Sequence, residues 1–169
     1  YYDNDALFDA FVIRGGQETV VPEKVEVGNK TALYTDDMLA GWNLRVIDNT
    51  DPDVIYTWPY DLDIGKINNH SSAYGHSLAF NVGQVSGTIT TIFEGTYLAL
   101  AFADTYYACK VIVDIDGKVI GEFTPHSTLR PETSDVAYQS RIWFVKDDLL
   151  PLKKAVIADV LFDIPCLMP

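Results

Sequence analysis

The stretch that most constrains the fold covers residues 86–123. Nearly every residue in it is β-branched, aromatic or aliphatic, apart from polar groups at Glu94-Gly95-Thr96, Asp104-Thr105 and Asp116-Gly117. Residues of those types suit a pleated, half-buried surface, so the stretch predicts four strands joined by three turns. Asp116-Gly117 is the most specific local signal, because a two-residue type I′ turn needs positive φ at both central positions.

Shorter runs of the same kind recur along the rest of the chain. Residues 36–40 are the best candidate for a single helical turn, and residues 60–74 and 124–135 are polar stretches that predict surface loops. Pro22 interrupts the valine-rich residues 19–27 and favours an edge strand there. Further strands are predicted over residues 7–13, 31–34, 43–47, 54–58, 77–82, 138–145 and 155–162.

These elements indicate a single all-β domain over residues 1–169. The count is roughly ten to twelve short strands, and short connections favour antiparallel pairing. No amphipathic helix of normal length is apparent in the sequence. An antiparallel β-sandwich is therefore predicted rather than an α/β fold.

Composition limits the classes of partner. The chain has 169 residues, 12 Lys and Arg against 24 Asp and Glu, and a formal net charge of −12. Such a chain repels nucleic acid and anionic membrane surfaces, so neutral or cationic ligands are better candidates. No apolar run is long enough to span a bilayer. Aromatic residues make up 12% of the chain, enough to leave rings for a binding surface.

Several features bear on the cellular setting. The chain begins Tyr1-Tyr2 without Met, as in a mature product or a segment of a longer protein, and two glycosylation sequons begin at Asn29 and Asn69. An extracellular or cell-surface location is therefore predicted, with a covalently linked neighbouring domain as a candidate partner. Cys109 and Cys166 are the two cysteines; they could form one disulfide or remain as two buried thiols.

Four phrases of the sequence occur in a recognisable order. They resemble the extracellular, galactose-binding-like jelly-roll modules found on fungal surface proteins and before the catalytic domain of some carbohydrate esterases. The resemblance covers residues 47–158 and implies a jelly-roll sandwich that binds carbohydrate. Residues 1–42 lie outside it and either add strands to the sandwich or belong to a preceding region. Lys153-Lys154 stands where those modules open their last strand with a His-Thr pair. The phrases are Ile47 to Tyr56 with Trp58, Phe93-Glu94-Gly95-Thr96, Val113 to Lys118, and Tyr138-Gln139-Ser140.

Catalytic motifs are not apparent in the sequence. There is no Gly-x-Ser-x-Gly elbow, no His-Glu-x-x-His and no Gly-rich phosphate loop. The 24 acidic residues make chance carboxylate pairs certain, so a glycosidase pair is not indicated. The chain alone is predicted not to be an enzyme.

A sugar site needs aromatic faces and a few polar groups that bond hydroxyls. Aromatic residues in or beside the predicted loops, and polar residues near them, are the candidates. Gln139, Arg141 and Trp143 alternate along one strand and would line a groove together; a solvated outer face is the alternative. The full set is Trp58, Tyr60, Tyr74, His76, Asp104, Tyr106, Tyr107, Gln139, Arg141 and Trp143.

Asp48, Asp51 and Asp53 form a cluster of hard oxygen ligands that is compatible with a structural calcium ion. An Asx-turn network without metal is the alternative. The spacing does not match an EF-hand.

Three functions follow from these observations. The first is a non-catalytic carbohydrate-binding module that recognises a polysaccharide or glycan. The second is a structural or adhesion domain whose partner is a protein, and an unpaired edge near residues 19–27 would favour it. The third is an accessory fragment of an esterase or glycoside hydrolase.

Overall fold

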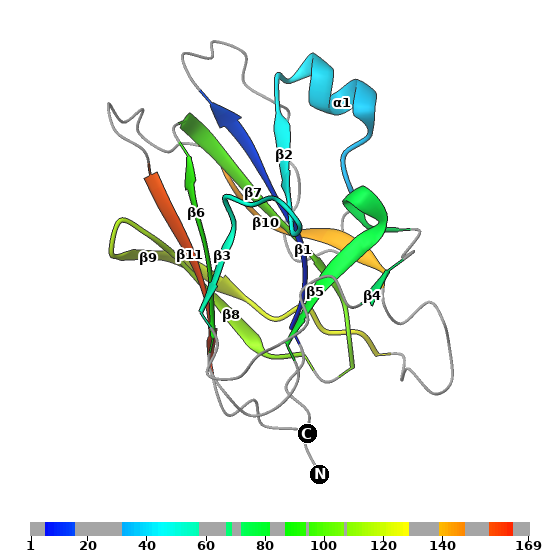
Figure 1. The fold of residues 1–169 in the computed structure, drawn as a ribbon, viewed down its shortest axis with the longest axis vertical. Helices are drawn as coiled ribbons and strands as arrows, with labels where there is room; N and C mark the ends of the chain where they lie inside the picture. The colour runs from blue at the N-terminus through cyan, green and yellow to red at the C-terminus, as the bar shows by residue number, and fades with distance from the viewer. Residues whose placement is uncertain are drawn as a thin grey trace.

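The computed structural model describes residues 6–15, 32–57, 67–68, 72–81, 87–93, 95–106, 108–128, 139–147 and 156–163. These residues form two antiparallel sheets and very little helix (Figure 1). The predicted all-β class is therefore confirmed. Residues 19–27, and with them the predicted edge strand, lie outside the described ranges.

The first sheet is organised around strand β1. Its six strands run in the order β10-β7-β1-β5-β4, with β2 also paired to β1. β1 pairs with β7 along one side, and with β5 and then β2 along the other. The strands are β1 (Ala6–Gly15), β2 (Arg45–Asp48), β4 (Ile67–Asn68), β5 (Ser77–Asn81), β7 (Gly95–Ala103) and β10 (Ser140–Lys146).

The second sheet has five strands in the order β3-β6-β11-β8-β9. They are β3 (Ile55–Thr57), β6 (Thr88–Phe93), β8 (Lys110–Ile115), β9 (Lys118–Phe123) and β11 (Val156–Asp163). Every pairing within it is antiparallel. Burial alternates along β8, where Val111, Val113 and Ile115 are buried and the residues between them are not, so this sheet has one core face and one outer face.

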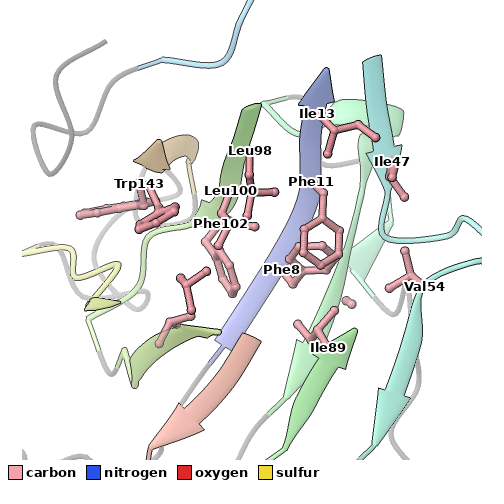
Figure 2. Close-up of a cluster of buried hydrophobic side chains, with 14 of the residues drawn as sticks. Phe8, Phe11, Ile13, Ile47, Val54, Ile89, Leu98, Leu100, Phe102 and Trp143 are labelled. Atoms are coloured by element: carbon pink, nitrogen blue, oxygen red, sulfur yellow. The ribbon is translucent and has the colours of Figure 1, made fainter. Parts of the chain in front are cut away.

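One hydrophobic core joins the two sheets (Figure 2). Phe8, Phe11 and Phe102 come from the first sheet, while Ile89 and Val113 come from the second. The rings of Phe8 and Phe102 meet edge to face with centroids 5.3 Å apart. Burial of these large apolar side chains is the main stabilising contribution to a sandwich of this kind.

Residues 86–123 form four strands as predicted, but their partners differ from a simple meander. β6 and β7 are consecutive in the chain yet belong to different sheets, so the chain passes from one sheet to the other between them. Only β8 and β9 form a hairpin, and Asp116 and Gly117 have φ values of 53° and 82° in its turn. Positive φ at both positions confirms the predicted turn.

A short cover lies over part of the outer face of the first sheet. Helix α1 (Asp36–Gly41) begins at Thr35, whose side chain accepts a hydrogen bond from the Met38 N–H, as an N-cap should. Tyr34 and Leu44, on either side of α1, are buried in a second apolar cluster with side chains of β1, β7 and β10. The predicted helical turn is therefore confirmed.

Candidate functional site

Three residues predicted as ligand contacts meet where β7 ends and β10 begins. Asp104 directly follows β7, while Gln139 and Arg141 flank the first residue of β10. The register places Ser140 opposite Ala103, and the Asp104 N–H donates to the Gln139 carbonyl at 3.1 Å. Antiparallel pairing of two strands remote in sequence therefore brings these side chains together.

The positive charge of Arg141 pairs with the negative charge of Asp104 in this group. Arg141 Nε lies 3.8 Å from Asp104 Oδ2, and Arg141 Nη2 donates to the side-chain oxygen of Gln139. The Asp104 side chain is 3% exposed and that of Arg141 is 27% exposed. A buried carboxylate needs such a partner, because an uncompensated buried charge is strongly destabilising. The guanidinium is thus held in a fixed orientation at the molecular surface.

Two rings are connected to this group through Thr105, the residue after Asp104. Tyr106 lies one residue beyond Thr105, and its ring centroid is 5.7 Å from that of His126. Thr105 and His126 form a parallel bridge in which the Thr105 N–H donates to Pro125 O at 3.0 Å. Both rings are partly exposed. Asp104, Tyr106, His126, Gln139 and Arg141 are called the rim cluster below.

Sequence reasoning did not select His126 as a ligand contact. Its ring lies near Tyr106, in a tilted arrangement, because residues 124–127 run beside residue 105. The one local signal is the polar loop after β9, which was predicted as a surface loop. That signal does not identify which strand end the loop returns to.

Other predicted contacts lie elsewhere. Tyr74 and His76 belong to the short helix η1 (Tyr74–His76) beside the first sheet. The Tyr74 hydroxyl accepts from the Tyr34 N–H at 2.9 Å and donates to the Tyr34 carbonyl at 3.2 Å, and burial raises the pKa of Tyr74. His76 is exposed. Tyr74 therefore holds the cover on the sheet rather than facing the rim cluster.

Trp143 is part of the core, contrary to its predicted place beside Gln139 and Arg141. It is 5% exposed, and its ring stacks on Phe123 with centroids 6.5 Å apart. A register shift between Ile142 and Phe144 marks an irregularity in β10 at this residue. Such a bulge breaks the two-residue alternation on which the prediction rested. Trp58, Tyr60 and Tyr107 lie outside the described residues.

The predicted calcium ligands are engaged in turn hydrogen bonds. Thr50 Oγ1 donates to Asp48 Oδ2 at 2.7 Å, and the Asp53 N–H donates to Asp51 Oδ1 at 2.8 Å. Among the described residues, no three His, Cys, Asp or Glu side chains are grouped so that they could hold a metal ion. The second contact is an Asx turn, and the calcium ion stays a prediction.

The structure describes only one of the two cysteines that could form a disulfide. Cys109 is buried in the chain segment before β8. Cys166 lies outside the described residues, so its pairing with Cys109 stays a prediction.

A buried polar junction was not predicted at all. Asp9 is fully buried on β1, its carbonyl accepts from the Asn49 N–H at 2.9 Å, and its Oδ2 accepts from the Tyr74 N–H at 3.2 Å. Burial raises the pKa of Asp9 to about 8, with the charge of Asp48 adding to the increase. The Asn49 amide, turned so that both ends are satisfied, donates to Asp48 Oδ2 at 3.1 Å and accepts from the Ala79 N–H at 3.2 Å.

Gly75 lies against the Asp48 side chain at this junction, and its replacement by alanine is expected to destabilise the protein. Its φ is +63°, and a Cβ would lie 2.9 Å from Asp48 Oδ2. Strain and this contact together predict a loss of about 2 kcal/mol in the free energy of unfolding, measured by urea denaturation. Gly41→Ala is the matched control, since nothing lies within 4 Å of its Cβ position. Equal effects of the two substitutions would contradict the prediction.

Among the described residues, no helix is both long and apolar enough to cross a membrane. Comparisons of the chain with protein-family models, with curated proteins and with solved structures find no match. The family resemblance drawn from the sequence therefore remains a prediction.

Proposed function

We propose that this chain is a non-catalytic carbohydrate-binding module of jelly-roll type, located outside the cell or at its surface, and that the rim cluster contacts the glycan. The observations that carry the proposal are the Arg141–Gln139–Asp104 contacts and the Tyr106–His126 ring pair, whose Tyr106 follows Asp104 by two residues in the chain.

The chemistry of the rim cluster suits a sugar. Hydroxyl groups need donors and acceptors in fixed positions, and a pyranose ring presents C–H groups that pack on aromatic faces. Arg141 and Gln139 supply donors and an acceptor, and their mutual contact limits their motion. Tyr106, two residues beyond Asp104, supplies a partly exposed ring that packs near His126.

Charge indicates the kind of glycan. Asp104 already neutralises Arg141, and the whole chain carries a net charge of −12. A polyanionic polysaccharide would meet repulsion over the whole approach. Neutral polysaccharides are therefore the first ligands to test, with uronate polymers as the negative comparison.

Arg141→Ala is expected to weaken binding to a neutral polysaccharide by about tenfold or more, because hydrogen bonds from a charged group contribute about 1.5–3 kcal/mol. Affinity gel electrophoresis with xylan, galactomannan and a soluble β-glucan measures this change. Arg45→Ala is the matched control, because Arg45 is exposed on β2 and pairs in register with Ile13, away from the rim cluster.

A second variant, Arg141→Lys, separates a loss of binding from a loss of folding. Arg141→Ala leaves Asp104 buried without its partner, whereas Arg141→Lys keeps a positive charge and loses only the planar fork. Binding that is unchanged in both folded variants would exclude the rim cluster. No binding by the unmodified chain to any of the three neutral polysaccharides would exclude the proposed function.

A protein partner is the second candidate function, and one observation favours it. Ile55, Ile92 and Val119 are 56%, 52% and 58% exposed. Ile55 pairs with Thr90, so Ile92 is its diagonal neighbour across β3 and β6. Val119 lies on β9 at the opposite edge of the same sheet. Isolated apolar side chains are common on protein surfaces, so this surface gives weaker support than the rim cluster gives to sugar binding.

A further inference from the structure

The first residue of β10, Ser140, has a backbone N–H that faces away from β7. Ser140 stands opposite Ala103, and the Asp104 N–H donates to the Gln139 carbonyl at 3.1 Å. In an antiparallel ladder, a bond between the residues that flank a pair means that the pair itself exchanges none. The Ser140 N–H therefore points to the far side of β10, which is the outermost strand of its sheet within the described part of the chain.

A serine side chain takes the position that a neighbouring strand would occupy there. The Ser140 N–H donates to Ser72 Oγ at 2.9 Å, although the two residues are 68 positions apart in the chain. A partly buried backbone N–H needs an acceptor, because leaving it unpaired costs about as much as a lost hydrogen bond. Ser72 thus caps the far side of β10 at the point where the strand begins.

The residue after Ser72 packs beside the same point of the sheet. Ala73 is 5% exposed and belongs to an apolar cluster with Leu7, Leu78 and Ala103. Ala103 is the register partner of Ser140. Contact between two alanines lets the backbone at Ala73 approach the sheet closely, so the segment that carries Ser72 lies against the end of β7.

Tyr74 holds the other end of this segment. Its N–H donates to Asp9 Oδ2 at 3.2 Å, and its hydroxyl is bonded to both the N–H and the carbonyl of Tyr34. Residues 72–74 are therefore anchored to β1 and to the cover. An acceptor on an anchored segment can fix the position of its donor, whereas an acceptor on a freely moving loop cannot.

The capped N–H lies between two members of the rim cluster. Gln139 precedes Ser140 and Arg141 follows it. Arg141 Nη2 donates to the side-chain oxygen of Gln139, and Arg141 Nε lies 3.8 Å from Asp104 Oδ2. Asp104 follows β7, so a shift of the start of β10 would move both other side chains relative to Asp104.

We propose that Ser72 is a positioning residue of the rim cluster: its hydroxyl holds the first residue of β10, so that Gln139 and Arg141 are presented to the glycan in a fixed geometry. The role rests on the proposed function for its ligand, but the capped edge of β10 does not. Ser72 itself lies in the polar stretch 60–74, where the sequence predicts a surface loop.

The first test follows the protein without any glycan and compares Ser72→Ala with Ser72→Thr. Amide hydrogen exchange at Ser140 is expected to become about tenfold faster or more in Ser72→Ala, and the Nε–H resonance of Arg141 is expected to shift. Both should return to their original values in Ser72→Thr, which keeps the hydroxyl. Unchanged exchange at Ser140 in Ser72→Ala would overturn the proposal.

Thr50→Ala is the matched control for the loss of a hydroxyl. Thr50 is exposed, and its hydroxyl donates to Asp48 Oδ2 at 2.7 Å, so the substitution removes one comparable hydrogen bond elsewhere in the chain. Exchange at Ser140 and the Arg141 resonance should remain as in the unmodified chain. Equal changes in Thr50→Ala and Ser72→Ala would mean a general loss of stability and would overturn the positioning role.

The second test measures binding to galactomannan, xylan and a soluble β-glucan in affinity gels. The dissociation constant is expected to rise about three- to tenfold in Ser72→Ala, as for one lost hydrogen bond, and to be close to the original in Ser72→Thr and Thr50→Ala. Faster exchange at Ser140 with unchanged binding would overturn the positioning role, as would a loss of binding that Ser72→Thr does not restore.

Failure of the proposed function gives a different result. If the unmodified chain binds none of the three polysaccharides, the proposed function is overturned and the glycan role of Ser72 with it. Faster exchange in Ser72→Ala, restored in Ser72→Thr, would then still support Ser72 as the group that holds the start of β10.

Discussion

Replacing Phe102 by alanine is expected to lower the free energy of unfolding by about 4 kcal/mol, the usual effect of deleting a fully buried ring. Phe102 is 0% exposed, in the middle of the core between the sheets. Its ring contacts Phe8 of its own sheet and Phe123 of the opposite sheet, with centroids 5.3 and 5.4 Å away. A cavity at this position removes contacts on both sides and has little freedom to collapse.

Chemical denaturation at one pH measures this effect. Phe102→Leu is the conservative comparison and should cost about half as much or less, because most of the buried volume is retained. Val119→Ala is the surface control and should change stability by no more than about 0.5 kcal/mol, since Val119 is 58% exposed. A loss below about 1 kcal/mol for Phe102→Ala would mean that the sheets do not pack on this ring.

Strand positions could be predicted because their causes are local. Apolar runs ended by Asp-Gly or similar turn residues mark β8, β9 and the hairpin between them, and the structure has both strands and positive φ at Asp116 and Gly117. The sheet to which each strand belongs could not be predicted. The crossing of the chain between β6 and β7 depends on which distant strands pair, and β7 pairs with β1 and β10.

In the rim cluster, too, the residue types could be predicted locally, whereas their contacts depend on pairing between distant strands. The sequence predicts Asp104 at a turn, and Gln139 and Arg141 from alternation along one strand, but the contact among the three arises from the β7–β10 register. Strict alternation along the strand predicts Trp143 on the same face. The register shift before Phe144 turns it into the core instead, and a bulge of this kind leaves no clear signal in the residues themselves.

Asp9 was missed for a related reason. In sequence it is a single acidic residue within an apolar strand, which usually indicates an exposed position on an edge. The structure places it on the central strand, covered by η1 and β2. Asp9 is buried because residues distant in the sequence, including residues 49 and 74, pack against it.

Asp9→Asn is expected to make the protein more stable at neutral and mildly alkaline pH. The folded state holds the Asp9 proton up to about pH 8, whereas an unfolded chain releases it near pH 4. Between these values the folded state binds more protons, so the free energy of unfolding falls as the pH rises and levels off above about pH 8. Asparagine carries no such dependence.

The sign and size of this effect can be measured by urea denaturation of both proteins at pH 5.5 and pH 8. The variant should gain about 3 kcal/mol relative to the unmodified chain between the two pH values, since each unit of pKa shift corresponds to about 1.4 kcal/mol. Taking the difference between the proteins cancels the titration of the other acidic groups. A variant that is equally destabilised at both pH values would mean that Asp9 is ionised in the folded protein, and its carboxylate would then be a stabilising acceptor instead of a buried acid.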